Sequence, residues 1–144
     1  MSEQLMNNVK ITLVKAAQTA ATTDFQTDII DMAGFEGVVF FGTIATDNAA
    51  NYIYAQQDTD SAGGTMAALE GTKVVAAADG QVVWLDIYKP EKRYVRVFVE
   101  RGGASTATGD FYAIQYQGRK GLISNLVADE LIGEIHISPA EGTA

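Results

Sequence analysis

The stretch QVVWLDIYKPEKRYVRVFVER, residues 81–101, decides the fold. In its two halves, Gln81–Tyr88 and Tyr94–Arg101, apolar side chains recur at every second position. Successive side chains of a strand point to opposite faces, so this period of two predicts two strands that each bury one face. The residues expected in the core are Val83, Leu85, Ile87, Val95, Val97 and Val99. Lys89-Pro90-Glu91-Lys92 predicts a tight turn between the two strands, because proline presets φ at a turn position.

Further segments with strand character lie on both sides of this stretch. Phe111–Gln117 and Asn51–Gln57 alternate in the same way. Val38–Thr46 is a continuous apolar run, which predicts a strand buried on both faces. Weaker candidates are Lys10–Ala17, Phe25–Met32 and Val74–Ala77. Strands at this spacing, joined by short connections rich in Gly, Asp and Asn, predict an all-β domain with an antiparallel β-sandwich or jelly-roll-like fold.

The expected boundaries divide the chain into a polar N-terminal arm at 1–9, a β-sandwich body at 10–120 and a C-terminal docking tail at 121–144. Within the body, 102–109 is expected to be a flexible loop, and one helical turn is expected at Met66–Leu69, with Thr65 as N-cap and Gly71 as terminator. The apolar residues of the tail are Leu122, Ile123, Leu126, Val127, Leu131, Ile132, Ile135 and Ile137. Such a tail docks either on its own sandwich or on another subunit, since undocked termini are normally polar and disordered.

Composition excludes several classes of function. A chain of 144 residues and 15.4 kDa fits one domain. It has no cysteine and a single histidine, His136, which excludes a disulfide framework, a thiolate nucleophile and a Cys- or His-rich metal centre. The net charge of −8 argues against a broad basic face for nucleic acid. The start of the chain lacks the regions of a secretion signal, and no apolar run approaches the ~20 residues that span a bilayer. We therefore expect a protein made in a cytoplasm, with neither a nucleic acid nor a membrane as partner.

Motifs that carry catalysis do not occur in the sequence. There is no G-x-S-x-G elbow, P-loop, H-E-x-x-H or G-x-G-x-x-G. Asp58-Thr59-Asp60-Ser61 resembles half of a calcium loop, but the required glycine and bidentate glutamate are missing, which favours a solvated loop. His136 has no evident nucleophile or orienting group. We expect no catalytic residue, cofactor or metal, and the one enzymatic alternative left open is a glycosidase-like pair of carboxylates.

Two sets of residues point to binding. Five aromatic residues on expected strands would suit stacking on sugar rings if they shared a face, although strand aromatics more often belong to a core or an interface: Tyr52, Tyr54, Trp84, Tyr112 and Tyr116. Seven of the ten basic residues fall between positions 89 and 120: Lys89, Lys92, Arg93, Arg96, Arg101, Arg119 and Lys120. In an acidic chain this asymmetry indicates either a basic edge that faces an acidic partner or cross-strand pairs with Glu91 and Glu100.

Three motifs carry a resemblance to known proteins. Residues 86–96 have the pattern D-x-Y-x-P-x-x-R-Y-V-R, residues 136–144 read HISPAEGTA, and residues 34–38 read GFEGV. With these packing and turn motifs, roughly residues 10–144 resemble small virion structural proteins of tailed bacteriophages, in particular capsid decoration (cement) proteins. The resemblance implies a β-sandwich that binds the outer capsid surface as a homotrimer. It would sit where several copies of the major capsid protein meet and stabilise the shell.

The function expected from the residues and the resemblance together is that of a non-enzymatic virion structural protein, assembled in the host bacterial cytoplasm. Its partners would be the major capsid protein and further copies of itself. The candidate interface residues are Tyr88, Arg93, Tyr94, Arg96, Arg119, Lys120, Leu131, Ile132, Ile135 and Ile137. Roles within the sheet are the alternative for two of them: Tyr94 would pack, and Arg96 would pair with Asp86 across a hairpin. The alternative functions are a tail or head–tail joining protein and a virion-displayed carbohydrate-binding module that takes a surface glycan.

Overall fold

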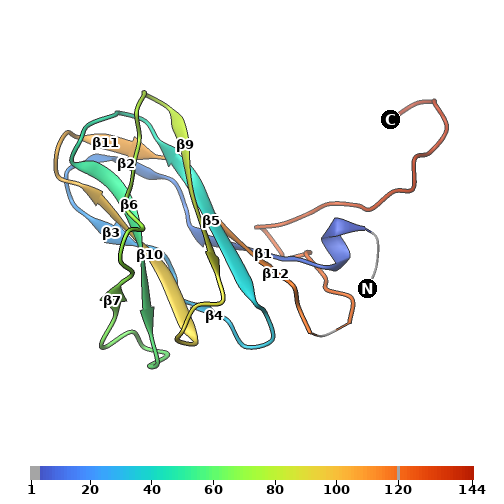
Figure 1. Cartoon of the computed structure of the whole chain (residues 1–144). Helices are drawn as coiled ribbons and strands as arrows, with labels where there is room; N and C mark the ends of the chain where they lie inside the picture. The colour runs from blue at the N-terminus through green and yellow to red at the C-terminus, as the bar shows by residue number, and fades with distance from the viewer. Residues whose placement is uncertain (1–3, 120) are drawn as a thin grey trace.

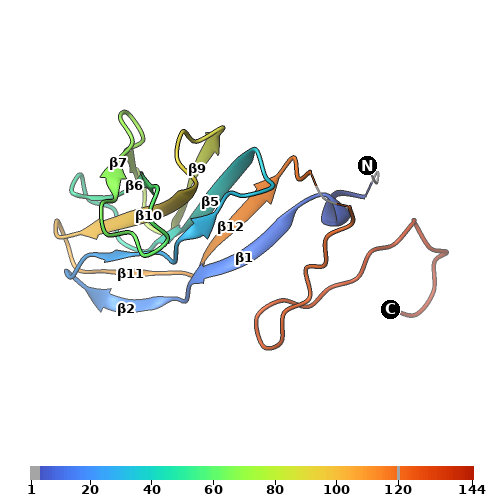
Figure 2. The ribbon, with the colours of Figure 1, turned by 90° about the horizontal axis from the view of Figure 1, so that it is seen from below.

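The computed structural model describes residues 4–119 and 121–144. Two antiparallel sheets pack face to face, and the chain that follows them runs away from the sheets as an arm (Figure 1). The predicted antiparallel β-sandwich is therefore confirmed. The first described residues, 4–9, and the arm lie on the same side of it, as a second view also shows (Figure 2).

Sheet A contains four long neighbours in the order β1 (Lys10–Lys15), β12 (Phe111–Tyr116), β5 (Gly37–Ile44) and β9 (Gln81–Tyr88). The short strand β11 (Thr106–Thr108) pairs with the last residue of β5, and β2 (Gln18–Ala21) pairs with β11. Sheet B is built on β10 (Tyr94–Arg101) and β6 (Asn51–Asp58). Two short strands flank β10, β3 (Phe25–Gln26) and β4 (Ile30–Asp31), and two flank β6, β7 (Ala67–Ala68) and β8 (Val74–Val75). Before β1, η1 (Leu5–Asn7) is a single 3₁₀ turn.

The core lies between the sheets and follows the alternation of the sequence. Val95, Val97 and Val99 of β10 are fully buried, and they meet Val83 and Leu85 of β9 in one apolar cluster. The predicted inward faces of β9 and β10 are confirmed in this way, with Ile87 half-buried at the margin. Removal of these side chains from water is the main stabilising contribution of the sandwich.

Three local predictions are wrong, each because pairing with a distant strand overrides the local pattern. Residues 66–69 form no helix, since Ala67 and Ala68 pair with β6. Residues 89–92 connect the two strands as predicted, but the hairpin assumed for an Arg96–Asp86 pair does not form, because β9 and β10 lie in different sheets. The expected loop 102–109 contains β11, which pairs with β2.

Arg101, counted above among the basic surface residues, belongs to the interior. It is 6% exposed. Its guanidinium donates hydrogen bonds from Nε to the carbonyl of Thr23 at 2.5 Å and from Nη1 to the carbonyls of Thr19 and Thr106 at 2.8 and 3.1 Å. The group also lies 5.0 Å from the ring centroid of Phe25. Arg101 therefore joins β10 to the segments around β2 and β11, which belong to the other sheet.

Asp58 closes the loop that resembled half of a calcium site. Its carboxylate accepts hydrogen bonds from the backbone N–H of Asp60 at 3.0 Å, from the hydroxyl of Thr65 at 2.8 Å and from the N–H of Thr65 at 2.7 Å. These donors, that of Asp60 first, lower the pKa of Asp58 from its ordinary 3.8 to about 2. The backbone of the loop and the Thr65 hydroxyl thus satisfy the carboxylate; residues 59–61 are exposed, as expected for a solvated loop, but Asp58 itself is fully buried.

The lowered pKa of Asp58 predicts a pH dependence of stability. A carboxyl group whose pKa is lower in the folded state stabilises the fold above its unfolded pKa, and this contribution is lost as the pH falls through the folded value. We expect Asp58→Asn to flatten the dependence of the unfolding free energy on pH between 3.8 and about 2. Urea unfolding at several pH values in this window measures it. The exposed Glu141→Gln is the control that keeps the wild-type slope, and an unchanged slope in Asp58→Asn would contradict the assignment.

Candidate interaction surfaces

The outer face of sheet A, which we call the aromatic face, is lined by apolar and aromatic side chains on its central and β9 strands. They are Val39, Phe41, Val82, Trp84, Tyr88, Tyr112, Ile114 and Tyr116. The strand register places them in rows: Tyr112 pairs with Phe41 and Phe41 pairs with Trp84, while Ile114 pairs with Val39. Neighbours in a row lie close enough to pack across the strands. The run 38–46 is therefore not buried on both faces as predicted, because its outer side chains are only half-covered, by these neighbours.

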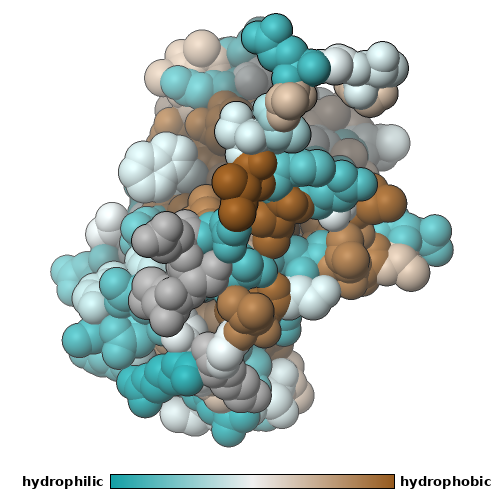
Figure 3. All heavy atoms as spheres, turned by 90° about the vertical axis from the view of Figure 1, so that its right-hand side faces the viewer, coloured by the Kyte–Doolittle hydropathy of each residue, from teal (hydrophilic) through white to brown (hydrophobic). Residues whose placement is uncertain are grey.

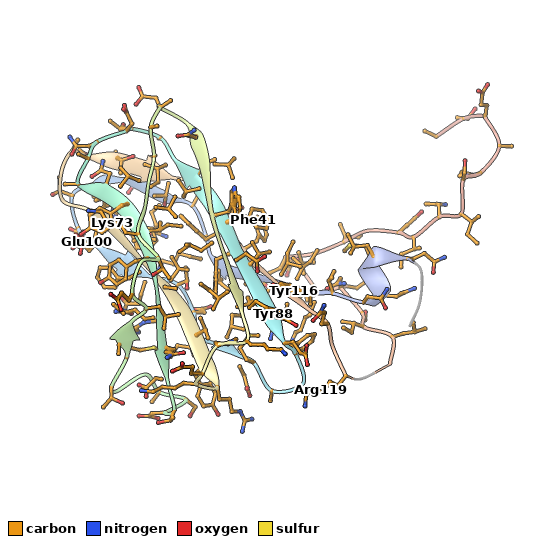
Figure 4. All side chains as sticks on the ribbon, in the orientation of Figure 1. Phe41, Lys73, Tyr88, Glu100, Tyr116 and Arg119 are labelled. Carbon is orange, nitrogen blue, oxygen red and sulfur yellow. The ribbon has the colours of Figure 1, made fainter. Side chains whose placement is uncertain are left out.

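The aromatic face is most exposed along β9. Val82, Trp84 and Tyr88 are 54%, 61% and 53% exposed, whereas the residues on β5 and β12 are half-buried. Figure 4 shows Phe41, Tyr88 and Tyr116 on the side of the sandwich that looks toward the arm. A monomer gains nothing from an exposed tryptophan in the middle of an apolar row, so this face has the character of an interaction surface.

Tyr116 is held rigidly within the aromatic face. Its hydroxyl donates to the carboxylate of Asp86 at 2.5 Å, and its ring is stacked on Tyr88 at 6.4 Å and 5° between planes. The ring covers Gly37 so closely that a Cβ at that position would have to displace the ring. Burial and the bond to Asp86 raise the pKa of Tyr116 to about 12. The face is thus preorganised, which lowers the entropy cost of binding.

The arm, residues 121–144, is tied to the sandwich at its start. The side-chain oxygen of Asn125 accepts a hydrogen bond from the N–H of Ile11 at 2.7 Å, at the outer edge of β1. Its amide nitrogen donates to the carbonyls of Met6 and Val9 at 2.8 and 2.9 Å. The N–H of Ile123 bonds the carbonyl of Asn7 at 3.1 Å. The arm and the N-terminal segment therefore anchor each other beside β1.

After this anchor, most apolar side chains of the arm are exposed to solvent. Val127 and Leu131 bond each other in both directions, at 3.0 and 2.9 Å, and close a turn. Ile132 is then 97% exposed and Ile137 84%, and Leu122 before the anchor is 75% exposed. Figure 3, which looks onto this side of the molecule, shows hydrophobic side chains in the open among hydrophilic ones. Of the two docking modes left open by the sequence, docking on the chain's own body is only partial: residues 132–135 line one groove with Met6, Asn7 and Ile11, yet all four remain exposed.

The outer face of sheet B is different, because its groups are partnered within the sheet. Tyr54 stacks on Phe98 at 5.3 Å, and Lys73 lies 4.0 Å from the ring centroid of Tyr52. A hydrogen bond to Glu100 raises the pKa of Tyr52 above its ordinary value. Figure 4 places Lys73 and Glu100 on the side away from Tyr88 and Tyr116. The five aromatic residues that the sequence singled out are therefore divided between two faces and form no single sugar-binding platform.

The basic residues are divided as well. Arg101 is internal, and Nε of Arg96 donates to Gln56 at 2.7 Å on sheet B. The expected pairing of Arg96 with Asp86 is wrong, since Asp86 lies on sheet A and bonds Tyr116. The remaining four described residues of the basic set, Lys89, Lys92, Arg93 and Arg119, line one hollow of about 580 Å³ at the end of the sandwich.

The hollow is not a free basic edge. Arg93 forms an ion pair with Asp31 at 2.8 Å, and Arg119 forms one with Glu36 at 3.4 Å. The acidic partners are thus Asp31 and Glu36, and not the predicted Glu91 and Glu100. Both pairs are solvent-exposed, and such pairs contribute little to stability.

The candidate interface residues occupy four places. Tyr88 lies on the aromatic face, while Tyr94 and Arg96 lie on β10 in sheet B. Arg93 and Arg119 line the end hollow, and Lys120 lies outside the described residues. The arm carries Leu131, Ile132, Ile135 and Ile137. The structure adds Phe41, Val82, Trp84 and Tyr116 to Tyr88. In the 38–46 run both the even-numbered and the odd-numbered positions carry apolar residues, and this pattern could have indicated an apolar outer face.

In the described residues no group of three or more His, Cys, Asp or Glu side chains is placed to hold a metal ion. Within the same part of the chain, no helix has the length and apolarity to span a membrane. Comparison with protein-family models, with curated proteins and with solved structures finds no match to this chain.

Proposed function

We propose that this chain is a non-enzymatic structural subunit that assembles with copies of itself, as a homotrimer, on the outer surface of a tailed-phage capsid. The observation that carries the proposal is the arm, which is anchored at Asn125 and then presents Ile132 and Ile137 to solvent at 97% and 84% exposure. The resemblance in motifs to capsid decoration proteins supplies the shell as the partner. The aromatic face offers a second, rigid surface for the same assembly.

The energetics of such a subunit favour assembly over the free monomer. Burying one large aliphatic side chain stabilises a complex by about 1.5–3 kcal/mol. Ordering an extended arm costs part of that gain. A trimer binds a lattice through several equivalent contacts at once, so modest contacts per subunit produce a long residence time. The stabilisation of the shell would follow from this multivalent clamping.

The mass in solution is the first test, measured by light scattering coupled to size exclusion. We expect three times the chain mass of 15.4 kDa, and we expect the trimer to pellet with expanded shells assembled from the major capsid protein of the same genome. A ring of six or twelve copies that ignores the shells would contradict the proposal and favour a tail or head–tail joining role. A monomer that ignores the shells and binds a glycan array through Trp84 would favour the carbohydrate-binding alternative.

A further inference from the structure

We infer that residues 133–138 of the arm add as a strand to the open β9 edge of sheet A in a second copy of this chain. The inference rests on the proposed self-assembly and specifies which two surfaces meet. Each copy would give its arm to one neighbour and receive an arm from another. A head-to-tail contact closes into a ring when the rotation between neighbours allows it, and a trimer is the ring in which that rotation is one third of a turn.

The β9 edge lacks the features that normally prevent pairing with another chain. In the described residues β9 pairs with β5 alone, over all eight of its residues and without a register shift. Its sequence QVVWLDIY contains no Lys or Pro and a single charged residue, Asp86. Long, flat and apolar edges of this kind are templates for strand addition, and proteins usually protect them with charges, prolines or bulges.

The opposite edge of the same sheet shows that protection. β1 has a bulge between Leu13 and Lys15, and the side chain of Asn125 occupies the N–H of Ile11 on its outer side. One edge of sheet A is therefore capped by the chain itself, and the other is left open. The arm that caps the first edge also supplies the strand for the second edge of a neighbour.

Residues 133–138, GEIHIS, have the pattern of a strand. Ile135 and Ile137 alternate with Glu134, His136 and Ser138, and Pro139 follows, which cannot donate to a ladder and so ends a strand. The segment has no strand partner in the structure, and its apolar side chains are exposed. An alternating, unpaired segment gains a full set of backbone hydrogen bonds when it adds to an edge.

The side chains on the two partners are complementary. An apolar groove of about 500 Å³ runs along β9, between it and β8, and its lining includes Val74, Val75, Val82 and Leu85. A strand added to β9 with Ile135 and Ile137 toward this groove fills it with aliphatic groups. Glu134 and His136 then face solvent, where they bond each other at 2.9 Å in the free arm.

The chain's own β9 edge is out of reach of this segment. The turn at 127–131 ends beside Ile11, and the arm stays there in the free subunit, because Leu131 and the next four residues line the same groove of about 470 Å³ as Ile11. From β1 to β9 is three strand spacings, or ~14 Å. Two residues, from Leu131 to Gly133, span at most ~7 Å. With the anchor in place the occupant is a second copy.

Cross-linking between two distinguishable copies tests the contact. Because the sequence contains no cysteine, only the introduced thiols can react. A tagged, heavier Ser138→Cys protein is mixed with untagged Ala77→Cys protein, whose new thiol lies at the β9 groove, and treated with a short bismaleimide. We expect a product containing one heavy and one light chain. The matched control is Gln26→Cys, an exposed position on β3 of sheet B, which we expect to give less than a tenth as much product.

A second pair of variants isolates strand addition. In the Ser138→Cys chain, Gly133→Ala/His136→Ala keeps the cross-link and Gly133→Pro/His136→Pro reduces it at least tenfold, because residues 133 and 136 direct their N–H groups to opposite sides of a strand and the two prolines remove whichever one bonds β9. Equal yields from the two variants overturn the inference, as does a double variant Ser138→Cys/Ala77→Cys that closes within one chain. If the sample remains trimeric but the Ala77→Cys protein gives no cross-linked product, the inferred contact is overturned and the proposed function is unaffected. The expected product from a protein that ignores capsid shells supports this contact and contradicts the capsid role.

Discussion

Removing residues 132–144 is expected to abolish self-assembly and to leave the sandwich folded. All of these residues are exposed, and the cut preserves the hydrogen bonds between Val127 and Leu131 and the anchor at Asn125. Burial of three isoleucines is worth roughly 6 kcal/mol, and even if ordering the arm offsets half of it, the loss weakens association about a hundredfold. Light scattering across a dilution series measures the change in mass.

The matched control for this truncation removes only the polar tip, residues 139–144, and is expected to assemble like the full chain. Thermal unfolding followed by circular dichroism is expected to give the same transition for both truncated proteins when each is compared as a monomer. A truncated protein that lacks the β-sheet signal would show that the arm belongs to the fold. If the chain that ends at residue 131 assembles like the full chain, the arm is not needed for assembly, and the aromatic face would be the surface that mediates it.

Arg101→Met is expected to destabilise the fold by about 3 kcal/mol, because it leaves buried carbonyls without donors and removes hydrogen bonds that involve a charged group. The carbonyls concerned are those of Thr19, Thr23 and Thr106, which lie around β2 and β11. Methionine fills much of the volume but donates nothing. Urea unfolding at neutral pH measures the loss.

Arg93→Met is the control for Arg101→Met, since its ion pair with Asp31 is solvent-exposed and little change in stability follows from its loss. The contrast also tests the division of the basic residues into one internal and several surface groups. Similar stability of the two variants would mean that the Arg101 guanidinium is hydrated rather than bound to the three carbonyls.

Alternation in the sequence predicted which faces of the strands are buried, but not which strands are neighbours. Val95, Val97 and Val99 lie inside as expected. The period of two says nothing about partners, so it could not show that the 89–92 turn crosses between the sheets and does not close a hairpin. The sequence pattern also failed to predict the short strands β7 and β11. They contain two and three residues, and they form only because β6 and β2 lie beside them.

The candidate surfaces show the same limit. The apolar tail was recognisable from its composition, and its exposure follows from a single amide, Asn125, whose three bonds to distant residues carry no local signal. The aromatic residues could be listed but not assigned to sheets, so Trp84 and Tyr54 were grouped although they lie on opposite faces. Arg101 has the sequence surroundings of a surface residue, and only the meeting of β10 with β2 and β11 makes it internal.

The position of β12 between β1 and β5 has a consequence for the order of folding. β1 pairs residue 10 with residue 115, so the first long strand has no partner in sheet A until nearly the whole body has been synthesised. Pairing over such a separation is slow, and an incomplete chain exposes unpaired strands. The arm follows β12 and emerges from the ribosome only after the last strand. If the arm binds neighbouring subunits as proposed, a nascent chain can do so only when its own sandwich can close, and unfinished subunits would stay out of the assembly.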